Sequence, residues 1–447
     1  MCKEEGIRHR EYCQLRRDIR GSKEHLIVGI DIAKKAHYAF FGTAVGKTLR
    51  KRLIFKNTHQ GFQELVEYAG SLQARHKLPK AVFGLEPTGN YHKPLGSYLI
   101  ENGHHLVLVS GEAAKSNRKL LDGRWDKHDT KYAANIADLI SQGKCLFYEK
   151  PSLQIQELRD LLSLRRRFKR EEHRIKMRIR NTLIAKHFPE LDQYYERCES
   201  EGLAILRWCH DPRQIAGMEY EQFYQMVTSS KKGLAQEKRL RAIHKEAGQT
   251  IGLDVARSSK YEARILVGSL HQIRKAIKEI EGLMHEVSLF FPEYKYILTI
   301  PGFGPYISAV VLARIGDPHR FQNTSQLIKL AGYDLCADRS GQNSNQATPI
   351  ISKKGNSELR YALYQAALVA TSFNPNFKKY FHEKLSGRER ERGIKTKMRV
   401  KMSAKLLVIA WTLMKKREPF NPAHVFINMK NFPSNPCQPN ENERGLS

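Results

Sequence analysis

The sequence predicts an α/β N-terminal domain, a long helical connection and a small, mainly α-helical C-terminal domain. Three observations support this prediction. Short apolar runs typical of strands alternate with helical patterns up to about residue 148. Two long helical stretches with apolar residues at heptad spacing follow. From residue 292 onward, a glycine-rich turn and amphipathic helices dominate the pattern.

These changes of pattern divide the chain into segments, which are a basic N-terminal tail (1–23), the α/β domain (24–150), coiled-coil helices (151–291) with an inserted helical segment (192–260), the C-terminal domain (292–425) and a disordered tail (426–447). The last segment is rich in Pro, Asn, Ser and Gly, a composition that does not support a packed core.

The α/β domain begins with three successive β-runs. Strand-like runs occur at 26–31, 36–42, 50–55, 80–86 and 105–109. Helical patterns at 60–75 and 91–101 separate the later runs. This order predicts an antiparallel start followed by parallel crossovers, which is the order of RNase H-like folds.

Two acidic residues in this domain end apolar runs. Asp31 follows LIVGI at 26–30, and Glu86 follows AVFGL at 81–85. A carboxylate among such residues loses hydration and needs a cation or a hydrogen-bond network, unless it leaves the sheet into solvent. Asp129 directly precedes another helical pattern and is either a third acid at this edge or a helix N-cap. Three or four carboxylates around divalent cations are a standard arrangement for phosphodiester cleavage.

The overall charge points to a polyanionic partner. Among 447 residues, 76 Lys and Arg face 46 Asp and Glu, for a net charge of +30. Such an excess favours nucleic acid or an anionic membrane. The longest apolar stretches, at 307–312 and 404–413, are too short to span a bilayer or contain lysine, and residues 1–23 lack the apolar core of a signal peptide. We therefore expect nucleic acid and no membrane.

Cysteine and histidine usage constrains the compartment and the metal. The seven cysteines are scattered and show no Cys-x-x-Cys spacing, which fits a reducing cytoplasm. The 18 histidines form neither a His-x-x-x-His nor a His-Glu-x-x-His motif. A bound metal should therefore have oxygen ligands, which favours Mg²⁺ or Mn²⁺.

Two long helices are predicted after the α/β domain. The first, at 153–188, contains nine Lys or Arg among residues 165–180. The second, at 262–290, carries an apolar seam of alternating steps of four and three, formed by Leu266, Leu270, Ile273, Ile277, Ile280, Met284 and Val287. This seam predicts dimerisation or an antiparallel pairing of the two helices, and packing of the stripe on its own domain is the alternative.

The C-terminal domain contains further candidates for phosphate contact. The sequence PGFG at 301–304 is a glycine turn that opens a helix, where backbone N–H groups bind phosphate or simply form an ordinary turn. A basic turn, SKKG at 352–355, precedes another helix, and 378–405 is dense in Lys and Arg. Between them lies a polar loop with the sequence DRSG at 338–341.

These motifs together resemble a known family. GIDIAK at 29–34, EPTGNY at 86–91 and KHDT at 127–130 resemble the successive acidic motifs of the DEDD transposases of bacterial insertion sequences (insertion-sequence family one-ten). PGFG, the stretch at 321–332, Ser340-Gly341 and SKKG are similar to the second domain of that family. The resemblance runs in order from about residue 25 to 420.

The resemblance implies a RuvC-like, RNase H-fold domain with four metal-binding acids, a coiled-coil connection and a helical domain with a nucleophilic serine. It places the first three acids on Asp31, Glu86 and Asp129, and the fourth at Tyr132. A phenol is a poor ligand for magnesium.

Asp126 or Asp138 is then the substitute for the fourth acid. Otherwise the site works with three acids or this copy is impaired. The resemblance places the nucleophile on Ser340, with Ser344 as the alternative. From the residues alone, a loop serine that forms a turn hydrogen bond is the commoner case.

The resemblance further implies strand cleavage through a covalent phosphoserine–DNA intermediate. It implies donor and target double-stranded DNA, a noncoding bridge RNA that pairs with both, and a homodimer, or a tetramer in the synaptic complex. Cytoplasmic action at the nucleoid follows from these partners. Nucleic-acid contacts are expected at Gly302, Gly304, Arg165, Arg166, Arg167, Lys169, Arg170, Lys353 and Lys354.

Two other functions remain compatible with the sequence. A metal-dependent nuclease of the Holliday-junction type would use the acids and water but not Ser340. A catalytically impaired nucleic-acid-binding relic is the second, and Tyr132 is the residue that suggests it.

Overall fold

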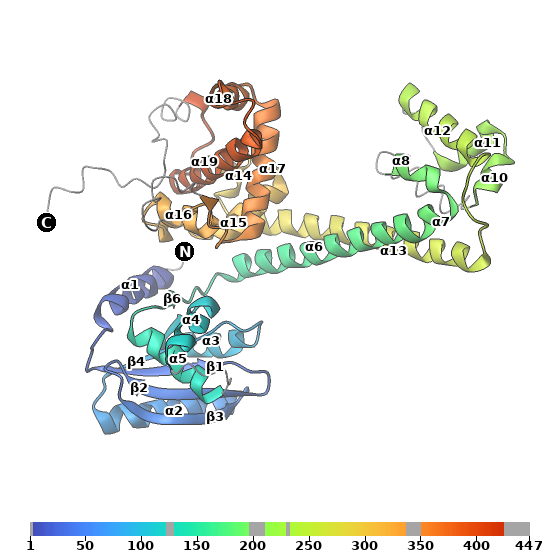
Figure 1. Cartoon of the computed structure of the whole chain (residues 1–447). Helices are drawn as coiled ribbons and strands as arrows, with labels where there is room; N and C mark the ends of the chain where they lie inside the picture. Colours follow the sequence, from blue (N-terminus) through green and yellow to red (C-terminus); the bar gives the residue numbers. More distant parts are fainter. Residues whose placement is uncertain (1–2, 122–128, 196–210, 229–232, 337–349, 424–447) are drawn as a thin grey trace, which may run out of the picture. The chain divides into compact units, whose positions relative to one another are not determined.

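The computed structural model describes residues 3–121, 129–195, 211–228, 233–336 and 350–423 (Figure 1). The chain forms two compact units, Met1–Ser152 and Leu153–Ser447. The first is a mixed α/β unit and the second is mostly helical.

The first unit is built on one six-stranded sheet with the order β3-β2-β1-β4-β5-β6. Its strands are β1 (His25–Asp31), β2 (Ala36–Thr43), β3 (Thr48–Lys56), β4 (Lys80–Leu85), β5 (His105–Leu108) and β6 (Leu146–Phe147). β1, β2 and β3 pair antiparallel, β4 pairs parallel to β1, β5 pairs parallel to β4, and β6 returns antiparallel. The predicted antiparallel start and parallel crossovers are confirmed.

Side-chain alternation along the strands gives the sheet two buried faces. Leu26, Val28 and Ile30 contribute to the core that includes residues of α2 and α3, while Ile27 packs with residues of α4 and α5 on the opposite face. The covering helices are α2 (His59–His76), α3 (His92–Glu101), α4 (Gly111–Leu121) and α5 (Asp129–Ser141). Burial of both faces explains why β1 is apolar at consecutive positions.

The basic segment at the N-terminus is a helix and not the expected tail. Helix α1 (Lys3–Asp18) is part of the first unit. The Tyr12 hydroxyl donates to the carbonyl oxygen of Cys145 at 2.7 Å, and Arg8 donates to that of Tyr148 at 2.9 Å. Its cationic side chains therefore serve partly as hydrogen-bond donors to backbone carbonyls near β6.

The second unit is organised around two long helices that run antiparallel and side by side, α6 (Leu153–Arg178) and α13 (Arg257–Leu289) (Figure 1). Arg165 pairs with Glu281 at 2.6 Å, and Arg178 pairs with Glu262 at 2.8 Å. Residues later in α6 thus contact residues earlier in α13, as in an antiparallel pair. Of the sequence-based alternatives for these helices, antiparallel pairing within one chain is the arrangement observed.

The apolar seam of α13 is covered by the chain itself. Leu266 and Leu270 belong to one hydrophobic core of the second unit. Ile280, Met284 and Val287 belong to another core, and the buried Ile277 lies between the two groups on the helix. Ile273 is partly buried. Because these side chains already have partners within the chain, the seam no longer supports the homodimer that it predicted.

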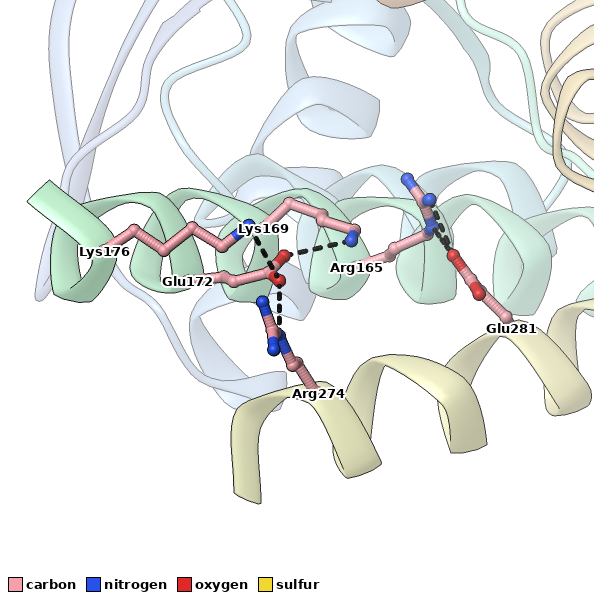
Figure 2. A network of polar contacts seen from close by, with 6 residues as sticks. All are labelled: Arg165, Lys169, Glu172, Lys176, Arg274 and Glu281. Atoms are coloured by element: carbon pink, nitrogen blue, oxygen red, sulfur yellow. Dashed lines mark hydrogen bonds and ion pairs between the residues drawn. The ribbon is translucent and has the colours of Figure 1, made fainter. Parts of the chain in front are cut away.

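A polar cluster fixes the register of the two helices. Glu172 of α6 is only 7% exposed and faces Lys169 at 3.0 Å, Arg274 at 3.1 Å and Lys176 at 3.7 Å (Figure 2). Burial raises the pKa of Glu172, but the hydrogen bonds from Lys169 and Arg274 outweigh it and hold the pKa below its usual value. A buried carboxylate with several cationic partners specifies one pairing of the helices.

Replacement of Ile280 by alanine is expected to lower the free energy of unfolding by about 2–5 kcal/mol, because it leaves a cavity between α6 and α13. Leu283→Ala is the matched control, since Leu283 lies on the same helix and is 48% exposed. Its loss should be clearly smaller. Thermal unfolding of the full chain at several protein concentrations measures both effects. A Tm that rises with concentration, with equal losses in the two variants, would show that the seam is shared between chains.

The second unit has a separate core at each end of the helix pair. Around one core lies the inserted segment, whose described residues include the helices α8 (Asp192–Tyr195), α10 (Pro212–Ala216), α11 (Tyr220–Val227) and α12 (Leu234–Ala247). Around the other core lie α14 (Tyr294–Ile297), α15 (Pro305–Ile315), α16 (Thr324–Ala331), α17 (Ser357–Phe373), α18 (Pro375–Leu385) and α19 (Ile394–Lys416), with the two-stranded ribbon β7 (Leu335–Cys336) and β8 (Ile350–Ile351).

Candidate active site and nucleic-acid interface

Asp31 and Glu86 lie at the ends of neighbouring parallel strands. The register pairs Ile30 of β1 with Leu85 of β4, and each acid is the next residue in its strand direction. Adjacent strands are about 4.8 Å apart. Both acids share the face of Gly29 and Gly84, because residues two apart in a strand point the same way. The structure therefore brings the first two predicted acids to one edge and one face of the sheet.

Helix α5 approaches this face at two glycines that are themselves paired. Gly29 lies opposite Gly84 across β1 and β4. A methyl group on Gly29 would lie 2.1 Å from the carbonyl oxygen of Ala133, and one on Gly84 would lie 2.2 Å from Cδ1 of Ile140. At Gly29 the contact is with the backbone of α5, so a larger residue there would push the helix away from the sheet. At Gly84 the contact is with the end of the Ile140 side chain, which can move aside. Gly29 thus sets the height of the helix above the sheet.

The close approach also places the third predicted acid. Asp129 is the first residue of α5 and precedes Ala133 by one helical turn. Its backbone position therefore lies toward the sheet edge where β1 and β4 end. The side chain of Asp129 and the whole of Asp126 lie outside the part of the chain that the structure describes.

Glu86 is held from two sides. The Tyr132 hydroxyl donates a hydrogen bond to Oε2 of Glu86. On the other side, a methyl group on Gly111, the first residue of α4, would lie 2.5 Å from Oε1 of Glu86. The Ser110 hydroxyl caps this helix by accepting from the N–H of Ala113 at 3.2 Å. A carboxylate is favoured near the N-terminus of a helix such as α4, because the helix dipole places partial positive charge there.

Tyr132 therefore occupies the position of the expected fourth acid without supplying a carboxylate. The proposed substitute Asp138 is six residues further, about 9 Å along the axis of α5. Its carboxylate accepts from Asn117 at 2.7 Å and from Gln142 at 2.8 Å. The structure uses Asp138 in the contact between α4 and α5.

His37 orders the loop that follows Asp31 and was not identified from the sequence. Its Nδ1 accepts the N–H of Ala33 at 3.2 Å, and its ring packs edge-on against Phe55. Burial lowers the pKa of His37, although a hydrogen bond with Asn57 acts in the opposite direction. The neutral ring is the form that accepts from Ala33. The only sequence signal was its place two residues into the second β-run.

The chemistry of this edge fits a hard divalent cation. Carboxylate oxygens are the ligands that Mg²⁺ and Mn²⁺ prefer, and the adjacent ends of β1 and β4 bring Asp31 and Glu86 to one edge of the sheet. Among the side chains that the structure describes, no group of three His, Cys, Asp or Glu is close enough to hold a metal. Asp31 and Glu86 are among these described side chains, and Asp129 is not.

Ser340 and Ser344 both lie outside the described residues, but the base of their loop does not. β7 and β8 pair antiparallel through Leu335 and Ile351. The Ser352 hydroxyl donates to Asp334 at 2.6 Å. A loop between two helices was expected, but the chain that leads into and out of the serine loop forms this two-stranded ribbon.

Two glycines close the base of this loop. A methyl on Gly355 would lie 2.3 Å from the nitrogen of Gly332, and Arg360 donates to the carbonyl oxygens of Ala331 and Gly355 at 2.8 and 3.0 Å. The predicted motifs at 321–332 and 352–355 are therefore one structural unit. Lys353, with a positive φ of 55°, is exposed beside it, as is Lys354.

The two glycines of the turn before α15 have different surroundings. A methyl on Gly302 would lie 2.4 Å from the carbonyl oxygen of Ala366, so this glycine permits the close packing of the turn on α17. Gly304 caps α15, and its Cα faces open space. Only Gly304 has surroundings that suit the expected phosphate contact.

The predicted nucleic-acid contacts on the basic helix α6 also fall into two groups. Arg165 pairs with Glu281 and stacks 3.9 Å above the ring of Tyr306, and Lys169 pairs with Glu172. Arg165 thus joins α6 to α13, whereas Lys169 has its carboxylate partner three residues further along its own helix. The remaining predicted cations are exposed, namely Arg166, Arg167 and Arg170.

In the part of the chain that the structure describes, no helix is long and apolar enough to cross a membrane.

Comparison with known proteins covers both units. A family model of DEDD transposases matches residues 28–189, and the model of the transposase IS116/IS110/IS902 family matches residues 294–382. The pilin gene-inverting protein of Moraxella bovis is 24% identical over 397 residues, which cover 88% of this chain and 97% of that protein. The insertion element IS116 uncharacterized 44.8 kDa protein of Streptomyces clavuligerus is 22% identical over 406 residues, covering 90% and 97%.

The first match contains the sheet edge with Asp31, Glu86 and the start of α5, and the second contains the glycine turn and the base of the serine loop. Both segments occur in the order that the sequence motifs predicted, so the chain belongs to the IS116/IS110/IS902 family of DEDD transposases and is a DNA transposase or recombinase.

Proposed function

We propose that the first unit is a RuvC-like, RNase H-fold catalytic domain and that the protein cuts and rejoins DNA at the ends of an insertion sequence. The convergence of Asp31 and Glu86 at the adjacent ends of β1 and β4, beneath the start of α5, supports this function. A sheet edge with several acids is poorly suited to a purely structural role, because clustered carboxylates repel one another without a cation.

Asp31, Glu86 and Asp129 would hold the cation, Mg²⁺ or Mn²⁺. When bound, the cation supplies stabilisation for the negative charge on the scissile phosphate. Tyr132 and the N-terminus of α4 orient the Glu86 carboxylate, so one oxygen faces each of them. His37 orients the loop after Asp31.

Ser340 is the proposed nucleophile. Its Oγ attacks a backbone phosphorus, an Oγ–P bond forms, and one P–O bond of the DNA strand breaks. The serine proton passes to the leaving oxygen, which becomes a free hydroxyl. A hydroxyl from another strand reverses the step and rejoins the DNA. The pairing of β7 with β8 holds the two ends of the segment that contains Ser340, which supports this assignment.

Double-stranded donor and target DNA and a noncoding bridge RNA are the proposed partners. The exposed Arg166, Arg167 and Arg170 would contact phosphates, while base pairing with the RNA would supply sequence, as in other RNA-guided systems. A homodimer, or a tetramer of two dimers, remains part of the proposal for the synaptic complex, which would act in the cytoplasm at the nucleoid.

A denaturing gel separates this function from its two rivals. The protein is incubated with Mg²⁺, bridge RNA and labelled DNA that carries the element end. A transposase leaves labelled DNA covalently attached to protein. A Holliday-junction-type nuclease leaves cut DNA without an adduct, and a non-catalytic relic leaves neither.

Tyr132→Phe is expected to weaken the affinity for Mn²⁺ by about tenfold, because loss of a group that orients a ligand typically costs about 10–100-fold. Tyr132→Asp should tighten Mn²⁺ binding, since it places a carboxylate where the family has its fourth acid. Calorimetric titration of Mn²⁺ into the full-length variants measures both effects independently of activity. Unchanged affinity in both variants would show that Tyr132 has no part in the site.

A further inference from the structure

A group of polar side chains joins α4 to α5. The Nδ2 of Asn117, on α4, donates to Oδ1 of Asn135 at 2.8 Å and to Oδ2 of Asp138 at 2.7 Å, both on α5. The Nδ2 of Asn135 in turn donates to the carbonyl oxygen of Ala114 at 2.7 Å. Later residues of α4 thus meet later residues of α5, so the two helices run in the same direction along this contact. Asn117, Asn135 and Asp138 form what we call the α4–α5 network.

The network favours a single register of the two helices. Asn117 is 7% exposed and Asn135 is 1% exposed. A buried amide is costly unless its donors and its acceptor have partners. A shift of one helix along the other would break these hydrogen bonds and leave buried polar atoms unpaired. Apolar contacts alone would tolerate such a shift more readily, because they are not directional.

The same register decides what surrounds the Glu86 carboxylate. Tyr132 precedes Asn135 by one turn of α5, and its hydroxyl donates to Oε2 of Glu86. Gly111 precedes Ala114 by one turn of α4 and lies beside Oε1 of the same carboxylate. Each helix therefore contacts Glu86 one turn before it contacts the other helix through the network.

The network adds a constraint that the contact of α5 with the sheet does not supply. Gly29 limits the height of α5 above the sheet through the backbone of Ala133. The position of α4 along α5 is a different coordinate, and hydrogen bonds between the two helices constrain it directly. Within α5, Gln142 donates to Oδ2 of Asp138 at 2.8 Å, which keeps this carboxylate in place to accept from Asn117.

We propose that Asn117, Asn135 and Asp138 are positioning residues for the Glu86 carboxylate. This role rests on the proposed function, in which Glu86 holds the cation. The network fixes α4 against α5, and the two helices together fix the place and direction of the carboxylate. The groups of a functional site must be held within about 0.5 Å of the productive geometry. A small slip between the helices therefore weakens cation binding without removing any ligand.

The first variant that tests this role is Asn135→Leu in the full-length protein. Leucine has a similar shape but cannot form the hydrogen bonds with Asn117 and Ala114. The affinity for Mn²⁺ is expected to fall about tenfold, because loss of a group that supports a metal ligand typically costs about 10–100-fold. Calorimetric titration measures this affinity independently of strand cleavage.

Two further variants separate positioning from stability. Leu65→Ala opens a cavity in the core on the other face of the sheet, so it should lower the Tm and leave the affinity for Mn²⁺ unchanged. Asn117→Leu/Asn135→Leu removes both amides of the network, which can be nearly neutral for stability, and it should still lose affinity. A merely structural network would lower the Tm of Asn135→Leu and leave its affinity at the level of Leu65→Ala.

A double-mutant cycle tests the route of the effect. In the Tyr132→Phe protein, Asn135→Leu should cost less affinity for Mn²⁺ than it does in the wild type. Both changes act on the same carboxylate, and the effects of coupled residues are not additive. Fully additive losses would show that Asn135 acts by another route and would overturn the proposal.

The same titrations distinguish failure of this proposal from failure of the proposed function. If Asn135→Leu and Asn117→Leu/Asn135→Leu bind Mn²⁺ as tightly as Leu65→Ala does, while Asp31→Asn abolishes binding, the positioning role is wrong and the proposed function stands. A wild-type protein that binds no Mn²⁺ would remove both together.

Discussion

Replacement of Asp31 or Glu86 by alanine is expected to abolish DNA strand cleavage while leaving nucleic-acid binding largely intact. The two carboxylates lie at neighbouring strand ends on the face beneath α5, and each would be a ligand of the same cation. Loss of metal-assisted charge stabilisation costs several kcal/mol in the transition state. At about 1.36 kcal/mol for each tenfold in rate, the expected loss is about a thousandfold or more.

Asp31→Asn and Glu86→Gln make this test more specific. They keep the shape of the side chain, and the amide oxygen that Glu86→Gln introduces can still accept from Tyr132, but they remove the charge that a cation requires. Glu67→Ala is the control, because Glu67 is exposed on α2. The readout is strand cleavage in Mg²⁺, with binding followed in parallel. Wild-type cleavage rates in any of the four site variants would remove the metal hypothesis.

Replacement of Ser340 by alanine should eliminate the covalent protein–DNA product and recombination together. The proposed chemistry needs the side-chain oxygen itself, which alanine lacks. Ser340→Cys should retain a trace of product, because a thiolate attacks phosphorus but departs from it differently. A denaturing gel of protein and labelled DNA shows the adduct directly.

Ser344→Ala is the control for this experiment. If Ser340→Ala still forms the adduct, Ser344 becomes the candidate, and if neither serine matters, the nuclease alternative is favoured. Mixing Asp31→Ala with Ser340→Ala protein then asks whether the acids and the serine act from different copies. Recovery of recombination in the mixture would require at least two copies in the active assembly.

Much of the first unit could be predicted from the sequence, because strand and helix periods are local properties. The apolar runs and turn residues identified β1 to β5, α2 and α3, and the acids at the strand ends followed from the order of those elements. The packing of α1 as part of the first unit could not be predicted from these local periods. A charged helix of low apolar content resembles a tail until its partners, such as the carbonyl of Cys145, are known.

The sequence by itself determined the family, the α/β-then-helical order and the candidate acids and serine, because these depend on residue type and spacing. Tertiary structure decided which cations are engaged within the protein. Arg165 has the same sequence signal as the exposed Arg166 and Arg167, yet it pairs with Glu281 of α13. It also showed that α6 covers the seam of α13 and that Tyr132 faces Glu86. A heptad stripe or a basic run in the sequence shows only one of the two surfaces that form a contact. Which segment supplies the other surface depends on how distant parts of the chain pack together.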